Sequence, residues 1–134
     1  MPKILIADDE AHVLRVASLW LERHGYDVVE APDGAAALEI LDRESVDMII
    51  SDMNMPGVDG VELARIVREE RGIDVPLLLL TARCDQGELA ARVEPYRVYV
   101  YPKPFVPSRL VADIDRLLAA HSSAGGETEV TVGR

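Results

Sequence analysis

The chain has 134 residues, of which 49% are hydrophobic and 28% are charged, a length and balance typical of one globular domain with its own core. Its formal net charge is −10, from 14 Lys and Arg residues against 24 Asp and Glu residues. Because nucleic acid binding needs a basic surface, this charge disfavours nucleic acid as a direct ligand and favours a basic partner or a metal cation.

Five predicted strands alternate with five predicted helices along the chain. The strands are short apolar segments, most of them nearly continuous in apolar residues, which is typical of parallel strands buried on both faces. The helices carry apolar residues at three- and four-residue spacing. In chain order, each strand with the helix that follows it, the expected pairs are 3–7 and 10–24, 26–31 and 34–43, 48–51 and 61–71, 75–80 and 85–93, and 98–101 and 107–120.

Residues that favour helix ends mark several of these boundaries. Gly25 ends the first helix, and Asp33 is a suitable N-cap for the second. Asp59 and Glu62 resemble a capping box at the start of the third helix. The fourth helix is the least regular, because Gly87 destabilises its first turn.

The alternation predicts one α/β domain over residues 1–121, with a parallel sheet and right-handed crossovers. Five strands and five helices fit the flavodoxin-like doubly wound sheet with strand order 2-1-3-4-5. In this order the first and third strands are neighbours, so the residues that follow them meet at one edge of the sheet. Residues 122–134 are small and polar at first and lack apolar periodicity, and we expect a flexible tail or a truncated linker there.

Polar residues follow four of the predicted strands. Asp8 and Asp9 follow the first strand, and Asp52 follows the third. Thr81 follows the fourth strand, and Lys103 lies just beyond the fifth. Carboxylates in close proximity repel one another unless a cation joins them, and Mg²⁺ prefers such hard oxygen ligands. The set therefore predicts a magnesium site beside one reactive aspartate, Asp52, that acts as a nucleophile toward a phosphoryl group.

These residues resemble those of a known family. In chain order they are Asp8-Asp9, Asp52, Thr81-Ala82 and Lys103-Pro104-Phe105. This set resembles the receiver domain of two-component response regulators. The loop 52–60 is similar to the phosphoacceptor loop of that family, and the stretch 25–34 is similar to its second strand and the turn that follows. The resemblance covers about residues 2–120, and its specificity comes from the order of the whole set.

The resemblance implies a role for each of the site residues. Asp52 would accept a phosphoryl group from a phosphohistidine on a sensor histidine kinase or a histidine phosphotransfer protein. Asp9 and Asp52 would ligate Mg²⁺ directly, together with the backbone carbonyl of Asn54. Asp8 would act on the metal through a water molecule. Lys103 would pair with the phosphoryl oxygens.

The resemblance also implies how the signal leaves the site. The Thr81 hydroxyl would hydrogen-bond a phosphoryl oxygen and draw in the loop that begins at Ala82. An aromatic ring on the fifth strand would then rotate inward, and the surface formed by the fourth helix, the fifth strand and the fifth helix would change. The side chains of Asn54 and Arg83 would tune hydrolysis of the phosphoryl group, with a purely solvated Arg83 as the alternative.

The predicted fifth strand departs from the family pattern. The position three residues before the lysine, usually aromatic, is Val100 here, and Tyr99 and Tyr101 flank it on the opposite face of the strand. Pro102 removes a hydrogen-bond donor, which a sheet tolerates at its edge. We therefore expect the signal to be transmitted by something other than the usual aromatic rotation.

The leading prediction is a signalling phosphoacceptor that catalyses only its own phosphorylation and dephosphorylation, and is otherwise not an enzyme. A phosphatase of the haloacid-dehalogenase type also uses an aspartate and Mg²⁺, but it needs a second aspartate two residues after the nucleophile, where this chain has Asn54. A phosphorylation-independent docking module, or pseudo-receiver, is the other alternative. Its sequence mark would be loss of Asp52, Lys103 or the acidic pair, and all of these are present.

The remaining expectations concern location and partners. Cys84 is the only cysteine, so no internal disulfide can form, which suits the reducing cytosol. The sequence has no signal-peptide layout and no apolar run of the ~18 residues that a membrane span requires, so we expect a cytoplasmic protein without membrane contact. We expect a monomer or a weak dimer, and no cofactor besides Mg²⁺. The output is either a separate downstream protein or an output domain missing from this chain.

Overall fold

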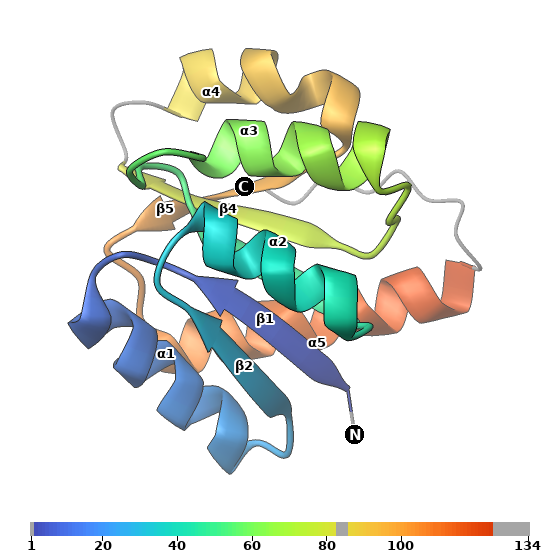
Figure 1. Ribbon diagram of the computed structural model, residues 1–134. Coiled ribbons are helices and arrows are strands. Elements are labelled where there is room, and N and C mark those ends of the chain that lie inside the picture. The colour runs from blue at the N-terminus through green and yellow to red at the C-terminus, as the bar shows by residue number, and fades with distance from the viewer. Residues whose placement is uncertain (1, 83–85, 125–134) are drawn as a thin grey trace.

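Strands and helices alternate along the chain in the computed structural model (Figure 1), which describes residues 2–82 and 86–124. The strands are β1 (Lys3–Ala7), β2 (Asp27–Ala31), β3 (Met48–Asp52), β4 (Leu77–Ala82) and β5 (Tyr99–Lys103). The helices are α1 (Ala11–Arg23), α2 (Gly34–Arg43), α3 (Gly60–Arg65), α4 (Gln86–Val93) and α5 (Pro107–Ala124), with a π-helical turn η1 (Ile66–Glu70) and a 3-10 turn η3 (Glu94–Tyr96).

The five strands form one parallel sheet in the order β2-β1-β3-β4-β5. This confirms the predicted strand order. The helices α1 and α5 cover one face of the sheet, and α2, α3 and α4 cover the other (Figure 1). Because β1 and β3 are neighbours, the strand order reverses between them. Open parallel sheets bind ligands at such a switch point, just outside the carboxyl ends of the strands.

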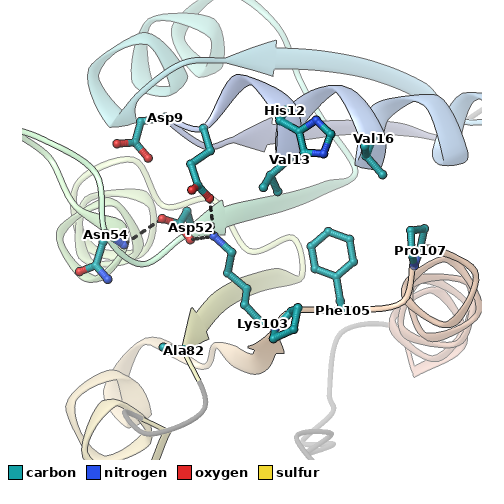
Figure 2. A pocket seen from close by; sticks show the side chains of 12 residues that line it. Asp9, His12, Val13, Val16, Asp52, Asn54, Ala82, Lys103, Phe105 and Pro107 are labelled. Atoms are coloured by element: carbon teal, nitrogen blue, oxygen red, sulfur yellow. Dashed lines mark hydrogen bonds and ion pairs between the residues drawn. The ribbon is translucent and has the colours of Figure 1, made fainter.

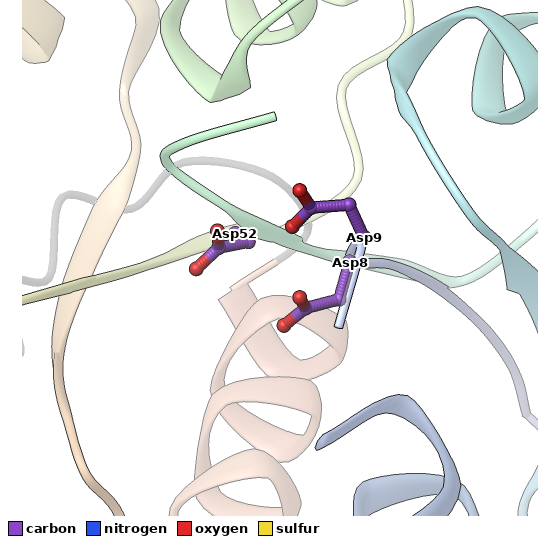
Figure 3. A group of neighbouring side chains, drawn as sticks. All are labelled: Asp8, Asp9 and Asp52. Atoms are coloured by element: carbon purple, nitrogen blue, oxygen red, sulfur yellow. The ribbon is translucent and has the colours of Figure 1, made fainter. Parts of the chain in front are cut away.

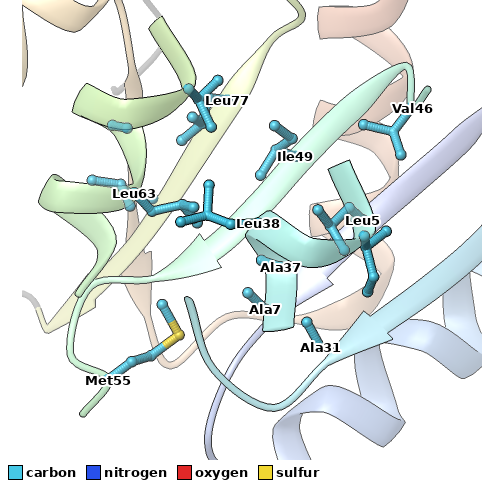
Figure 4. Packing of buried hydrophobic residues seen from close by; sticks show 14 of the residues in the cluster. Leu5, Ala7, Ala31, Ala37, Leu38, Val46, Ile49, Met55, Leu63 and Leu77 are labelled. Carbon is cyan, nitrogen blue, oxygen red and sulfur yellow. The ribbon is translucent and has the colours of Figure 1, made fainter. Parts of the chain in front are cut away.

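Alternate residues of the central strands contribute to two apolar cores, one on each face of the sheet. In β1, Leu5 and Ala7 belong to the core under α2, α3 and α4, whereas Ile4 and Ile6 belong to the core under α1 and α5. Figure 4 shows the first of these cores, in which Leu38 of α2 lies against the sheet. Burial on both faces explains why the strands are continuous in apolar residues.

Two of the predicted helix caps form as hydrogen bonds. Asp33 Oδ1 accepts the backbone N–H of Ala36 at 2.8 Å, and Asp59 Oδ1 accepts that of Glu62 at 2.9 Å. The cap at Asp59 starts α3 at Gly60, and the predicted helix 61–71 then forms as α3 continued by η1. These caps satisfy N–H groups that the first turn of a helix leaves without intrahelical partners.

Arg68 in η1 connects three segments that are distant in the sequence. Its guanidinium donates to the backbone carbonyls of Ile73 and Val75, and also to those of Tyr96 and Arg97. Burial, and to a smaller extent the nearby Arg97, lowers the pKa of Arg68 to about 10. The side chain thus holds the connection between α4 and β5 against the end of η1.

The last two elements extend beyond their predicted ends. β5 continues two residues past 101, so Lys103 is its final residue. It can include Pro102 because β5 lies at the edge of the sheet and pairs with β4 alone. α5 continues past residue 120 to Ala124, and so includes the first three residues of the predicted tail 122–134; residues 125–134 lie outside the described residues.

Candidate functional site

Asp8 and Asp9 stand directly after β1, at the carboxyl edge of the sheet. The backbone N–H of Asp8 donates to the carbonyl of Ala31, the last residue of β2, at 3.1 Å. Asp8 Oδ1 accepts the backbone N–H of Glu10 at 2.9 Å, whereas its Oδ2 is buried without a hydrogen-bond partner in the part of the chain that is described. Asp8 is only 1% exposed, and Asp9 is exposed. The end of β1 therefore presents one buried and one accessible carboxylate.

Asp52 is the last residue of β3 and is 6% exposed. Its Oδ2 accepts the backbone N–H of Asn54 at 3.2 Å, and its Oδ1 accepts the ammonium of Lys103 at 2.8 Å. The following loop turns back closely, since Gly60 donates to the carbonyl of Met53 at 2.9 Å. A side chain at Gly60 would approach the Asp52 carbonyl to 2.6 Å. The glycine is therefore required by the close approach of the loop to Asp52.

Asp8, Asp9 and Asp52 meet at this edge as predicted (Figure 3). Each offers a carboxylate oxygen, and the three oxygens lie within 4.8 Å of one another. Burial, with a smaller contribution from the charge of Asp52, raises the pKa of Asp8 to about 6. The buried Oδ2 of Asp8, which accepts no hydrogen bond from the described residues, and three converging hard oxygen donors fit a divalent cation such as Mg²⁺, which would offset the mutual repulsion of the carboxylates.

Lys103 is the positive charge of the site. Its Nζ lies 2.8 Å from Asp52 Oδ1, 3.3 Å from Glu10 Oε1 and 3.8 Å from Asp8 Oδ2. Burial acts to lower the pKa of Lys103, but the hydrogen bond from Lys103 to Asp52 and the surrounding carboxylates outweigh it and raise that pKa. The ammonium is thus held charged beside the carboxylate of Asp52.

Thr81 lies at the same edge, in β4. The residue before it, Leu80, is the register partner of Asp52. Thr81 is buried, and the hydrogen bond that its hydroxyl donates to the carbonyl of Ala82 is long, 3.5 Å, so that bond does little to fix the hydroxyl. Thr81 contacts none of the three carboxylates among the hydrogen bonds of the described residues, in contrast to Lys103.

An open pocket of about 740 Å³ lies over Asp52. Figure 2 shows Asp9 and Asn54 on one side of this pocket and Val13, Phe105 and Pro107 on the other. Its lining residues are Asp9, Glu10, His12, Val13, Val16, Asp52, Asn54, Ala82, Lys103, Pro104, Phe105 and Pro107. The pocket therefore combines a charged floor with an apolar wall made by α1 and the loop before α5.

Sequence reasoning missed two features of this pocket. The contact between Glu10 and Lys103 was not predicted, although Glu10 follows the acidic pair directly in the sequence. The apolar wall was also not predicted, because Val13 and Val16 have the three- and four-residue spacing that is expected of any helix face packed on a sheet. Both depend on how the start of α1 faces the loop after β5, which the sequence pattern does not specify.

Comparison with known proteins gives the family. Residues 4–115 match the model of the response regulator receiver domain. The chain belongs to this family. It is similar to the transcriptional regulatory protein ResD of Bacillus subtilis, with 38% identity over 120 residues that cover 87% of this chain and 48% of ResD. It is also similar to the phosphate regulon transcriptional regulatory protein PhoB of Pseudomonas aeruginosa, with 33% identity over 131 residues that cover 97% of this chain and 57% of PhoB.

A solved structure agrees with this assignment. The chemotaxis protein CheY4 of Vibrio cholerae aligns with this receiver domain at a TM-score of 0.81 and 32% identity, covering 87% of this chain and 98% of that chain. The predicted family and fold are therefore confirmed. The chain spans about half the length of the curated relatives it matches. None of the helices within residues 2–82 and 86–124 has the length and apolar character needed to span a bilayer.

The residues expected to carry the signal in this receiver domain lie on both faces of β5. Val100 packs against the core under α2, α3 and α4, whereas Tyr99 and Tyr101 pack against the core under α1 and α5. The Tyr101 hydroxyl donates to Asp113 Oδ2 of α5 at 2.5 Å. Tyr99 and Tyr101 thus lie on the opposite face of the strand from Val100, as the alternation of the strand predicted, and this is the face that α5 covers. Arg83, predicted to tune the site, lies outside the described residues.

Proposed function

We propose that Asp52 of this receiver domain accepts a phosphoryl group from the phosphohistidine of a sensor histidine kinase or a histidine phosphotransfer protein. The observation that carries the proposal is the position of Asp52 at the floor of the pocket, 2.8 Å from the ammonium of Lys103. A buried carboxylate placed beside a fixed positive charge is suited to attack an anionic phosphoryl group.

In the proposed transfer, an oxygen of Asp52 forms a bond to phosphorus and the phosphorus–nitrogen bond of the phosphohistidine breaks. The imidazole nitrogen keeps the bonding electron pair. The phosphoryl group carries negative charge on its peripheral oxygens, so the main task of the site is to position and neutralise that charge. Lys103 provides a positive charge for one of these oxygens, and Thr81 can donate its hydroxyl to another.

The acidic residues would hold Mg²⁺. Asp9 and Asp52 would ligate the ion with the backbone carbonyl of Asn54, and Asp8 would act through water. When bound, the ion supplies a second positive centre for the phosphoryl oxygens. The support in this chain is the buried Oδ2 of Asp8, which has no hydrogen-bond partner among the described residues, and the convergence of the three carboxylates within 4.8 Å.

We further propose that the protein acts on no substrate other than its own phosphoryl group. A phosphatase of the haloacid-dehalogenase type would need an acid two residues after Asp52, and Asn54 supplies none. The pseudo-receiver alternative, which binds partners without phosphorylation, is less well supported because Asp52 and Lys103 are both present and in contact.

The phosphorylation signal would leave through the surface of α4, β5 and α5. Its reader would be a protein partner or an output domain, since the net charge of −10 disfavours direct contact with nucleic acid. The reader of the signal would contact α5, because Tyr101 of β5 donates a hydrogen bond to Asp113 of α5 and so links two elements of this surface.

The test is intact mass measurement after incubation with Mg²⁺ and acetyl phosphate. We expect one phosphoryl adduct that depends on Mg²⁺, is lost on treatment with hydroxylamine, and is absent in Asp52→Asn. Asp27→Asn is the matched control, because it removes an exposed aspartate at the start of β2, at the opposite edge of the sheet. If the wild-type protein forms no adduct and also gives no response to a beryllofluoride–Mg²⁺ titration, phosphotransfer to Asp52 is wrong and the pseudo-receiver reading replaces it.

A further inference from the structure

We propose that Glu10 acts as an electrostatic gate on the phosphorylation of Asp52. Its carboxylate holds Lys103 and repels anionic phosphodonors, and so slows transfer most from the donors that carry the most negative charge. The inference rests on the proposed function of Asp52 and deepens it by naming a residue that sets phosphodonor preference.

The backbone of Glu10 is fixed while its side chain is accessible. Its N–H donates to Asp8 Oδ1 at 2.9 Å, and its carbonyl accepts the N–H of Leu14 at 3.1 Å, in the first turn of α1. The side chain makes no capping hydrogen bond to α1 and is 61% exposed. Glu10 therefore places a carboxylate at the mouth of the pocket, and α1 does not depend on that carboxylate for its N-terminal cap.

Glu10 and Asp52 share one ammonium group. Lys103 Nζ lies 3.3 Å from Glu10 Oε1 and 2.8 Å from Asp52 Oδ1, and the Lys103 side chain is 21% exposed. A phosphoryl group arriving at Asp52 needs the charge of Lys103 for its own oxygens, so it must compete with Glu10 for that ammonium. The same carboxylate also adds negative charge along the route into the pocket.

Replacement of Glu10 should change the rate of Asp52 phosphorylation and leave the free energy of unfolding nearly unchanged. An ion pair with one partner this exposed adds little to the free energy of unfolding. A donor that enters with two negative charges meets the full repulsion of the Glu10 carboxylate at close range. For such an approach, removal of one charge is expected to change the rate by a small factor that depends on salt, because exposed charges are screened.

Two small donors of different charge separate this effect from a general one. Acetyl phosphate is a dianion in neutral water, and on transfer its phosphorus–oxygen bond breaks and acetate leaves with the electron pair. Phosphoramidate carries one net negative charge, and on transfer its phosphorus–nitrogen bond breaks and ammonia leaves with the electron pair. In both cases the new bond joins phosphorus to an oxygen of Asp52.

The experiment compares Glu10→Gln with wild type by intact mass, with Mg²⁺ and each donor in turn. We expect Glu10→Gln to raise the rate constant with acetyl phosphate roughly three- to fivefold, and to raise it less with phosphoramidate. The gain should shrink in ~1 M salt, where the Debye length is about 3 Å. Glu22→Gln is the matched control, since it makes the same change on α1 roughly 18 Å farther along the helix axis, and should leave both rates unchanged.

Two results would overturn the gate while leaving the proposed function intact. One is a wild-type adduct that Glu10→Gln forms at the same or a lower rate with acetyl phosphate. The other is an equal gain in Glu22→Gln, which would assign the effect to overall charge. If wild type reacts with neither donor, the affinities of wild type and Glu10→Gln for beryllofluoride and Mg²⁺ decide. Tighter binding by Glu10→Gln than by wild type supports the gate, and equal or weaker binding overturns it. If no variant binds, both the proposed function and the gate are wrong.

Discussion

Replacement of Asp8 by Asn is expected to stabilise the metal-free protein at neutral pH. Asp8 is 1% exposed, its Oδ2 has no hydrogen-bond partner among the described residues, and burial raises its pKa from 3.8 to about 6. The fold thus buries a carboxylate whose charge is unfavourable, because the ammonium of Lys103, 3.8 Å from Asp8 Oδ2, offsets only part of the cost of burial. Asn has nearly the same shape, and its Oδ1 can still accept the N–H of Glu10.

The sign and size of the effect follow from the pKa of Asp8. Because this pKa is higher in the folded than in the unfolded protein, the folded state binds the proton more tightly and ionisation of Asp8 destabilises it. The loss of folding stability begins near pH 4, where Asp8 ionises in the unfolded chain, and it is complete above about pH 6. A pKa rise from 3.8 to about 6 corresponds to about 3 kcal/mol. The stability of Asp8→Asn relative to wild type should therefore grow by about this amount between pH 4 and 7.5.

Urea unfolding in the presence of EDTA at pH 4, 5.5 and 7.5 measures this difference. Asp9→Asn is the control, because Asp9 is the adjacent acid but is exposed, and its replacement should give well under half of the change. Added Mg²⁺ should stabilise wild type more than Asp8→Asn, since the free energy by which a ligand stabilises the folded state increases with its affinity for that state. A stability difference that does not vary with pH, or an Asp8→Asn protein less stable than wild type at pH 7.5 in EDTA, would refute the reasoning.

Two further variants probe the loop after β3 and the link from β5 to α5. In Gly60→Ala the new Cβ would lie 2.6 Å from both the Asp52 carbonyl oxygen and Leu79 Cδ2. We therefore expect the free energy of unfolding in urea to fall by about 1–3 kcal/mol and acetyl phosphate to label Asp52 more slowly. Unchanged labelling would mean that the loop shifts without affecting Asp52. Tyr101→Phe removes the hydrogen bond to Asp113 and should cost about 1–2 kcal/mol, with labelling of Asp52 unchanged because the ring faces α5. A lower labelling rate in Tyr101→Phe would contradict the expectation that the Tyr101–Asp113 hydrogen bond does not affect Asp52.

The fold and the carboxylates of the site were predictable because each depends on a local pattern. Continuous apolar runs identify strands buried on both faces, and the alternation with helices leaves few sheet orders. Once β1 and β3 are neighbours, Asp8 and Asp52 must meet, because each directly follows or ends its strand. The caps at Asp33 and Asp59 were predictable for the same reason, since they depend on residues three apart.

The features that were not predicted depend on contacts between distant segments. Glu10 reaches Lys103 across 93 positions of the sequence, and no spacing rule links them. Arg68 is an ordinary helical residue in the sequence, and only the folded chain brings the carbonyls of Tyr96 and Arg97 to it. The end of β5 was placed too early because the apolar run that marked the strand stops at Tyr101, although an edge strand can continue through a proline.

The edge position of β5 has a consequence for how copies of the protein meet. A parallel sheet ends in a row of unpaired backbone groups that can template a further strand from another chain, which is a route to aggregation. Pro102 in β5 has no backbone N–H to donate, and natural edge strands use proline to block strand addition. Growth of the sheet past β5 is therefore disfavoured, and association on this side of the molecule must use the side chains of α4 and α5.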